Sequence, residues 1–401
     1  MKGAPTPLTV PDLGRKENPL AREYSAFRVS ERLLLTGHSH QAWPDVGFVA
    51  QQQAWQDAAL HVDAKWEHAF AKVERVQRGY ASLLGDEDGD IALAPNTHEL
   101  VVRFLSALPL RERPRLVTTD AEFHTMRRQL DRLAEEGVVE VVKAAGYPAW
   151  GAVDRLVEQV DDRTAAVLVS AVLFERGVIV PGLGRLAEAC AHHGAELLVD
   201  AYHALGAIPF ELSRHGLEGA FVVGGGYKYL QLGEGNCFLR TPPGCALRPV
   251  LTGWFSEFGE LAESPSPGAV GYGKGAARFA GSTFDPTSAY RGAAVMDFFA
   301  ERGLEPELLR DISEHQVRLL ARTFHGLDLD PRLVLLDETV RMEDRGGFLA
   351  LTAPDAGRLC AGLKERGVLT DSRGSTLRFG PAPYLTDAQV VAAMEALGEV
   401  V

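Results

Sequence analysis

Short apolar runs alternate with helical segments through the first two thirds of the chain. The runs include RLVTT at 115–119, EVVKAA at 140–145, AAVLVSAVLF at 165–174 and ELLVD at 196–200. Amphipathic segments near residues 153–160 and 183–193 separate them. Strands that alternate with helices predict an α/β fold, with a mainly parallel sheet between two layers of helices.

The pattern differs before and after this region. Residues 49–84 carry apolar side chains at helical spacing, and Gly85 supplies a C-terminal stop. From about residue 286, long helices are followed by short strands and a closing helix capped at Thr386, which indicates a smaller α+β domain. We therefore predict an N-terminal arm at 1–48 that forms part of the small domain, a large domain at 49–285 and a small C-terminal domain at 286–401.

Composition narrows the possible partners and the compartment. The 401 residues carry a formal net charge of −13, which disfavours nucleic acid and anionic membranes as partners. The four cysteines show no CxxC motif and no metal-ligand spacing. The N-terminus lacks the apolar core of a signal peptide, and no apolar run could span a bilayer. We expect a cytoplasmic protein that has no metal site.

Two residues between positions 196 and 240 indicate the chemistry. Asp200 ends the apolar run ELLVD, at the strand end where open α/β sheets bind ligands. Lys228 follows within the glycine-rich segment GGGYKYL, after a second apolar run. Pyridoxal 5′-phosphate (PLP) needs a lysine for its Schiff base and an acidic partner for its pyridinium nitrogen. Each residue alone has a more ordinary interpretation, a solvated lysine or a helix cap, but the pair points to PLP.

A third segment offers an anion site. In IALAPNTHELVVRF a strand runs into a helix, and Asn96 and Glu99 form a capping-box pattern. Free backbone amides and the helix dipole favour an anion there, with Thr97 and His98 as candidate ligands. A simple helix cap is the alternative.

The segments DAYHALGAIPFEL and GGGYKYLQLGEG resemble the class V aminotransferase group of fold-type I PLP enzymes, and within it most resemble kynureninase. The resemblance covers about residues 36–386. It implies that Lys228 holds PLP, that Asp200 binds the ring nitrogen and that His203 lies beside the ring. It also implies that Phe123, or the adjacent His124 if the alignment shifts by one, stacks on the ring and that Arg378 binds the substrate carboxylate.

The resemblance assigns further residues to the phosphate and to the substrate. Thr97, His98 and Tyr227 would hold the phosphate, together with Ser282 and Thr283 of a neighbouring subunit, which makes the protein a homodimer with a shared active site. Ser39 and His61 fall where kynureninases contact the substrate. A solvated turn and a structural histidine, respectively, are the alternatives for these two positions.

Several reactions fit such a site. The resemblance favours Cβ–Cγ hydrolysis of a kynurenine-type substrate. The segments GHSH at 37–40 and GSTF at 281–284 depart from the family pattern, so transamination is nearly as well supported as hydrolysis. A cysteine desulfurase is disfavoured because GVLTDSRGSTLRFG contains no nucleophilic cysteine. A non-catalytic binding protein would not need Asp200, Lys228 and Arg378 together, and GGGYKY is not the GxGxxG of a Rossmann enzyme.

Overall fold

The computed structural model describes residues 8–260 and 268–401. Its centre is a seven-stranded sheet in which β10 is antiparallel to both neighbours and all other pairs are parallel. In spatial order the strands are β2 (Asp90–Ala94), β10 (Cys237–Thr241), β9 (Phe221–Gly225), β8 (Glu196–Asp200), β5 (Thr164–Ser170), β3 (Arg115–Thr119) and β4 (Glu140–Ala144). The predicted α/β fold with a mainly parallel sheet is confirmed.

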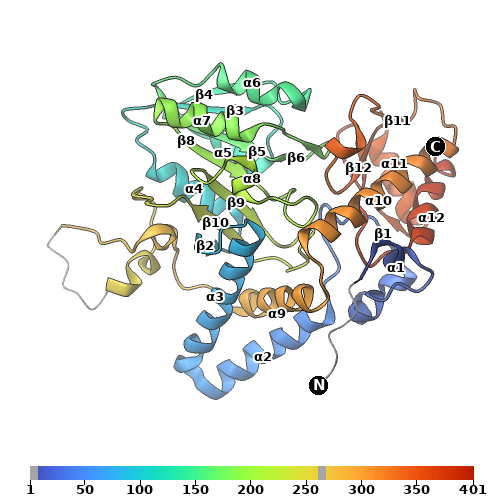
Figure 1. The fold of residues 1–401 in the computed structure, drawn as a ribbon, viewed down its shortest axis with the longest axis horizontal. Coiled ribbons are helices and arrows are strands. Elements are labelled where there is room, and N and C mark those ends of the chain that lie inside the picture. Colours follow the sequence, from blue (N-terminus) through green and yellow to red (C-terminus); the bar gives the residue numbers. More distant parts are fainter. Residues whose placement is uncertain (1–7, 261–267) are drawn as a thin grey trace.

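Helices cover both faces of this sheet (Figure 1). On one face lie α4 (Thr97–Ala107) and α5 (His124–Glu135), and on the other lie α6 (Ala152–Val157) and α7 (Leu183–His193). The side chains of β8 alternate accordingly, since Leu198 belongs to one buried cluster and Leu197 and Val199 to the other. Apolar residues on both faces explain why this strand reads as a continuous apolar run.

The helical stretch expected at 49–84 is two helices. These are α2 (Asp45–His61) and α3 (Lys65–Leu83), separated by the short η3 (Val62–Ala64). The break falls at Val62, whose φ of +50° no α-helix allows. Gly85, with φ +60°, ends the stretch as predicted. The apolar spacing was therefore right, but it did not reveal the change of direction at Val62.

The C-terminal part carries a second, antiparallel sheet. Its spatial order is β11 (Leu335–Leu336), β12 (Leu349–Thr352), β15 (Thr376–Phe379) and β14 (Asp371–Arg373). Its helices are α10 (Pro306–Gly326), α11 (Ala356–Glu365) and α12 (Asp387–Gly398), the last with the expected capping box at Thr386. The long α9 (Thr287–Glu301) instead packs against α2 and α3.

The N-terminal segment lies beside this C-terminal part (Figure 1). Strand β1 (Leu33–Leu34) pairs in parallel with β13 (Val368–Leu369), and a bridge joins Thr36 to Gly380. These pairings place the GHSH segment next to the β14–β15 hairpin. The division at residues 48 and 285 remains a prediction, and residues 1–7 of the arm lie outside the described part.

The remaining elements are short. They are α1 (Val10–Gly14), α8 (Leu212–His215), the pair β6 (Val172–Leu173) and β7 (Val178–Ile179), and the 3-10 turns η1 (Ala21–Phe27), η2 (Val29–Glu31), η4 (Ala149–Gly151), η5 (Trp254–Glu260), η6 (Gly275–Phe279) and η7 (Met342–Asp344). Within residues 8–260 and 268–401, every helix is too short or too polar to cross a membrane.

Candidate active site

Three neighbouring parallel strands bring the candidate residues together at one edge of the sheet. Asp200 is the last residue of β8, and Lys228 follows the end of β9, which pairs with β8. On the other side, Ser170 ends β5 in register with Asp200. Because the carboxyl ends of parallel strands share an edge, this is the expected position for a ligand in an open α/β sheet.

Lys228 is buried against His203. Its side chain is 5% exposed, and Nζ lies 2.7 Å from His203 Nε2. Burial lowers the pKa of Lys228 to about 7, although the charge of Asp200 opposes the shift. Burial also lowers the pKa of His203, and the charge of Lys228 lowers it further. An amine with this pKa is partly unprotonated at neutral pH, which is what a nucleophilic lysine requires.

Asp200 is a partly desolvated carboxylate. Its Oδ1 accepts a hydrogen bond from the Tyr202 amide at 2.8 Å. Burial raises the pKa of Asp200, while that amide and the charge of Lys228 act in the opposite direction. The carboxylate is thus able to pair with a cationic group of a ligand at the strand end.

Glu122 is a second buried carboxyl group near Asp200, and the sequence did not single it out. It is 2% exposed and accepts hydrogen bonds from the hydroxyls of Thr119 and Ser170. Burial raises the pKa of Glu122 to about 7, against the effect of both hydroxyls, and the charge of Asp200 adds to the increase. An acidic residue shortly after a strand end was the available signal.

Aromatic rings surround the lysine amine. Lys228 Nζ lies 4.6 Å from the ring centroid of Tyr202, 5.4 Å from that of Phe123 and 5.7 Å from that of Tyr227. Tyr227 in turn stacks on His40 at 5.2 Å. Phe123 and Tyr227 are therefore brought to Lys228, as predicted, and Tyr202 and His40 join them.

The N-terminus of α4 is linked to the same site. Asn96 caps the helix by accepting the Glu99 amide at 2.9 Å. The predicted capping box is incomplete, because the Glu99 carboxylate pairs with Arg103 at 2.6 Å and not with the Asn96 backbone. The Thr97 backbone hydrogen-bonds the Cys237 thiol, and that thiol contacts the Tyr202 hydroxyl at 3.6 Å. Thr97 is thus connected to Lys228 through two intervening residues, Cys237 and Tyr202.

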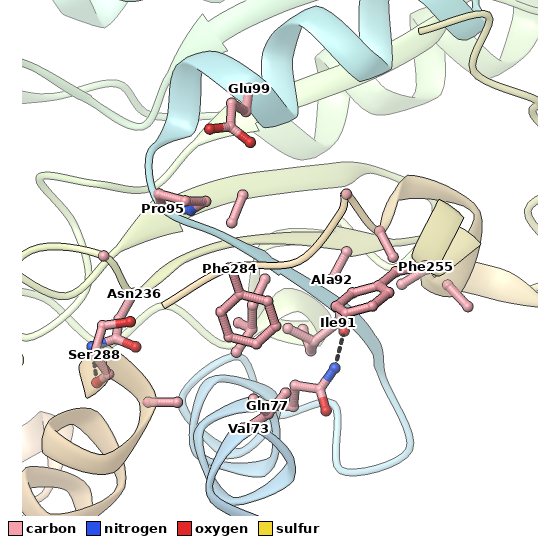
Figure 2. Close-up of a pocket in the computed structure, with 18 of the residues that line it drawn as sticks. Val73, Gln77, Ile91, Ala92, Pro95, Glu99, Asn236, Phe255, Phe284 and Ser288 are labelled. Atoms are coloured by element: carbon pink, nitrogen blue, oxygen red, sulfur yellow. Dashed lines mark hydrogen bonds between the residues drawn. The ribbon is translucent and has the colours of Figure 1, made fainter. Parts of the chain in front are cut away.

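A large cavity adjoins this helix end. It has a volume of about 1740 Å³ and lies between edge strand β2, helices α3 and α4, and residues 250–291. Figure 2 shows Ile91 and Ala92 of β2 crossing it, with Phe255 and Phe284 beside them. His98, Ser282 and Thr283 line the cavity, whereas Asp200, His203 and Lys228 do not. Within one chain, then, Ser282 and Thr283 share a cavity with His98 but are not placed at the lysine.

Arg378 is connected to His203 through the ring of Phe348. The Phe348 ring is 5.5 Å from the Arg378 guanidinium carbon and 5.9 Å from the His203 ring. Arg378 is 3% exposed and forms a two-pronged ion pair with Asp371, at 2.7 and 2.5 Å. His38 Nε2 lies 2.9 Å from the same carboxylate. The sequence predicted Arg378 but not its partners Asp371 and His38.

Two further predicted residues, Ser39 and His61, are also not placed at the lysine. The Ser39 hydroxyl lies 3.1 Å from Nδ1 of the exposed His40, which connects it to Tyr227 only through that histidine. His61 ends α2 and stacks on His68 at 4.5 Å. Contacts with substrate remain predictions for both.

The donor set suits a PLP-type cofactor. The strand end offers a buried amine with a pKa of about 7, a carboxylate, and rings that can cover a flat ligand. Nδ1 of His203 is buried and lacks a hydrogen-bond partner within the described residues. In the same part of the chain, no three His, Cys, Asp or Glu side chains are grouped to hold a metal ion.

Sequence comparison finds relatives with several activities. Residues 313–397 match the kynureninase C-terminal domain family. An uncharacterized aminotransferase of Bacillus subtilis is 25% identical, over 84% of this chain and 86% of its own. Isopenicillin N epimerase of Streptomyces clavuligerus is 27% identical (85% and 87%), and kynureninase of Bacillus cereus is 24% identical (86% and 82%).

Solved structures agree on the fold. A mutant of C-DES with glycine covalently linked to its PLP cofactor aligns with a TM-score of 0.82 at 16% identity, over 96% of this chain and 100% of that one. The cysteine desulfurase of Thermococcus onnurineus NA1 aligns with a TM-score of 0.77 at 18% identity, over 99% of both chains. Together with the sequence relatives and the family match, these similarities support a class V aminotransferase-like protein, and its fold is that of fold-type I PLP-dependent enzymes.

Proposed function

We propose that this protein is a PLP-dependent enzyme that acts on an α-amino acid. The observation that carries the proposal is the buried contact between Lys228 and His203, beside the strand-end carboxylate of Asp200. A structural lysine gains nothing from a buried position that lowers its pKa to about 7, whereas a cofactor-binding lysine needs it.

Each residue has a role that its surroundings support. Lys228 would hold the cofactor through Nζ, Asp200 would pair with the ring nitrogen, and Phe123 would cover a ring face. The amide-bearing N-terminus of α4, with Thr97 and His98, and the Tyr227 hydroxyl would hold the phosphate. The two free donors of Arg378, on its terminal nitrogens, would bind the substrate carboxylate.

When bound, PLP supplies an electron sink for negative charge that develops on the substrate. The protein then has to move protons and fix orientation. Lys228 Nζ can carry a proton between substrate atoms, because its pKa lies near the working pH. His203 Nε2, at 2.7 Å, can exchange a proton with that amine. Arg378 fixes one end of the substrate, so that the bond to be broken keeps a constant orientation.

Kynureninase-like hydrolysis is the reaction we favour. In this reaction water is added across the Cβ–Cγ bond of kynurenine, giving anthranilate and alanine. The family match over residues 313–397 includes Asp371 and Arg378 and supports this choice. A desulfurase-type reaction is disfavoured because Cys360 lies on α11, with its thiol directed to the Thr370 carbonyl at 3.5 Å.

Transamination is the second candidate, supported by the B. subtilis relative named as an aminotransferase. Anthranilate fluorescence separates the two. Purified protein with PLP and L-kynurenine should release anthranilate, and Lys228→Ala should not. If no anthranilate forms but amino acids with keto-acid acceptors are converted, transamination replaces hydrolysis.

We further propose a homodimer whose active site is shared. Ser282 and Thr283 are exposed and line the large cavity together with His98. If two chains associate through this face, these two residues of one chain would reach the phosphate position of the other chain. Large apolar side chains are also exposed on two elements that contribute other residues to this cavity, with Trp55 (80%) on α2 and Trp254 (46%) on η5.

A further inference from the structure

Asp371 and Arg378 face each other across two strands. They are directly paired residues of the antiparallel strands β14 and β15. Arg378 Nε donates to Asp371 Oδ1 at 2.7 Å and Nη2 donates to Oδ2 at 2.5 Å, so the carboxylate occupies the side edge of the guanidinium. The remaining nitrogen, Nη1, donates to the Phe174 carbonyl at 2.7 Å. The side chain is thus fixed from two directions.

A donor count shows what remains for a ligand. A guanidinium has five N–H groups in a rigid plane. Three are used, two by Asp371 and one by Phe174. The two that remain are one each on Nη1 and Nη2, the pair of nitrogens that can grip a second carboxylate with two parallel hydrogen bonds.

Asp371 is held in its turn by His38. His38 is fully buried, and burial lowers its pKa to about 4, against the hydrogen bond with Asp371. The neutral ring therefore donates from Nε2 to Asp371 Oδ1, at 2.9 Å. Burial alone would raise the pKa of Asp371, but hydrogen bonds from His38 and Arg378 lower it well below its usual range. Asp371 is accordingly a fixed anion at neutral pH.

We propose that Asp371 is the positioning residue that prepares Arg378 to receive the substrate carboxylate. It occupies the side edge of the guanidinium, so that, among the described residues, the donors left without a partner are one on Nη1 and one on Nη2. This inference rests on the proposed function, because it assumes a substrate with an α-carboxylate. Asp371 touches neither Lys228 nor its neighbour His203 by any hydrogen bond in the described part of the chain. Its charge has a small opposing effect on the lowered pKa of Lys228, so its direct contact with the substrate-binding group is the one with Arg378.

The arrangement has a consequence for selectivity. Asp371 balances the charge of the buried Arg378, and the exposed Arg373 lies 3.7 Å from the same carboxylate, so binding at Arg378 itself depends mainly on the two aligned hydrogen bonds. If the Arg378 donors lose their alignment, the affinity for ligands that carry the carboxylate should fall. The affinity for ligands that lack it should not change. A purely structural role for Asp371 would affect both kinds of ligand equally.

The test compares amino acids with their decarboxylated amines. PLP-loaded wild type, Asp371→Asn and Asp371→Ala are titrated with L-kynurenine and kynuramine, and with L-alanine and ethylamine, while the cofactor absorption is followed. We expect the apparent Kd and the KM for the amino acids to rise about 10- to 100-fold in both variants. The values for the amines should stay within about twofold of wild type.

A matched control is available elsewhere in the C-terminal part. Asp344 forms an equivalent two-pronged ion pair with Arg341 at 2.7 and 2.8 Å, but Arg341 is exposed and Asp344 is only half-buried. Asp344→Asn should leave all four titrations unchanged. Thermal melting of each apo-protein identifies loss of fold, and Asp371→Glu, which keeps the charge, should recover part of the affinity if Asp371→Asn melts early.

A double-mutant cycle completes the test. In an Arg378→Ala background, Asp371→Asn should weaken amino-acid binding little further, because both changes remove the same carboxylate site. Additive effects, or equal losses for amino acids and amines, would overturn the role of Asp371. If the wild-type protein shows no lysine-bound cofactor, or its absorption responds to neither amino acid, the proposed function fails first, and this inference fails with it.

Discussion

Lys228 Nζ and His203 Nε2 lie 2.7 Å apart in a buried part of the strand-end site. Burial disfavours the charged form of each, and a positive charge on one disfavours protonation of the other. Because the pKa of Lys228 is lowered to about 7, a large fraction of the amine is free at physiological pH. An ordinary surface lysine would be almost fully protonated there.

The first prediction concerns the pH dependence of cofactor uptake. The rate at which the apo-protein takes up PLP should rise with pH through a midpoint of about 7, since only the free amine reacts. Stopped-flow absorbance between pH 5.5 and 9 measures it, with Lys228→Ala as the control that should show no uptake phase. A midpoint near 10 would mean that the amine is not perturbed.

Asp200 gives a second prediction. Asp200→Asn keeps the shape of the side chain but removes the negative charge expected to pair with the cofactor nitrogen. Lys228 remains, so PLP should still bind, while turnover should fall about 100-fold or more. Steady-state rates and the absorption spectrum of the loaded variant check both statements. Turnover within a factor of two of wild type would contradict the role of Asp200.

Glu122 gives a prediction about stability. Its folded-state pKa of about 7 lies above the ordinary value of 4.5 for a glutamate, so between these pH values the folded chain holds a proton that the unfolded chain has lost. Stability from this group therefore falls as pH rises from about 4.5 to about 7. Glu122→Gln carries no titrating group at this position and should not show this loss. The free energy of unfolding of the variant, relative to that of wild type, should therefore be up to about 3 kcal/mol higher at pH 8 than at pH 4.5.

Urea unfolding of the apo-protein at both pH values measures the Glu122 effect. Glu112→Gln, at an exposed position, serves as the control and should not change the pH dependence. Equal differences between wild type and Glu122→Gln at pH 4.5 and pH 8 would show that Glu122 does not titrate abnormally.

The proposed shared active site predicts that two inactive variants restore activity when they form a hybrid dimer. Lys228→Ala chains and chains with Ser282→Ala and Thr283→Ala are each expected to have low activity. After they are mixed and allowed to exchange subunits, hybrid dimers should regain one intact site, for about a quarter of wild-type activity. If each site is built from one chain, the mixture will show only the average of its parents.

The core of this site could be predicted from the sequence because the end of a buried strand can be recognised as the end of an apolar run. Asp200 and Lys228 each follow an apolar run, and parallel strands place such residues at one edge of the sheet. Phe123 and Tyr227 were found by resemblance and lie around Lys228 Nζ. These positions depend on local pattern and on simple sheet topology.

Residues that depend on distant pairing were not predictable. Asp371 is recognised as the partner of Arg378 only when β14 and β15 are seen in register, and His38 reaches it from the other end of the chain. The break between α2 and α3 was missed because Val62 adopts a positive φ that its residue type disfavours. No local pattern encodes either feature.

The central claim is that Lys228 binds PLP, and the visible absorption spectrum of the purified protein tests it most directly. After incubation with PLP and removal of the excess, wild type should show the absorption band of lysine-bound PLP, and Lys228→Ala should lack it while melting at a similar temperature. A colourless wild-type protein that PLP cannot reconstitute, or an equal band in Lys228→Ala, would contradict the account.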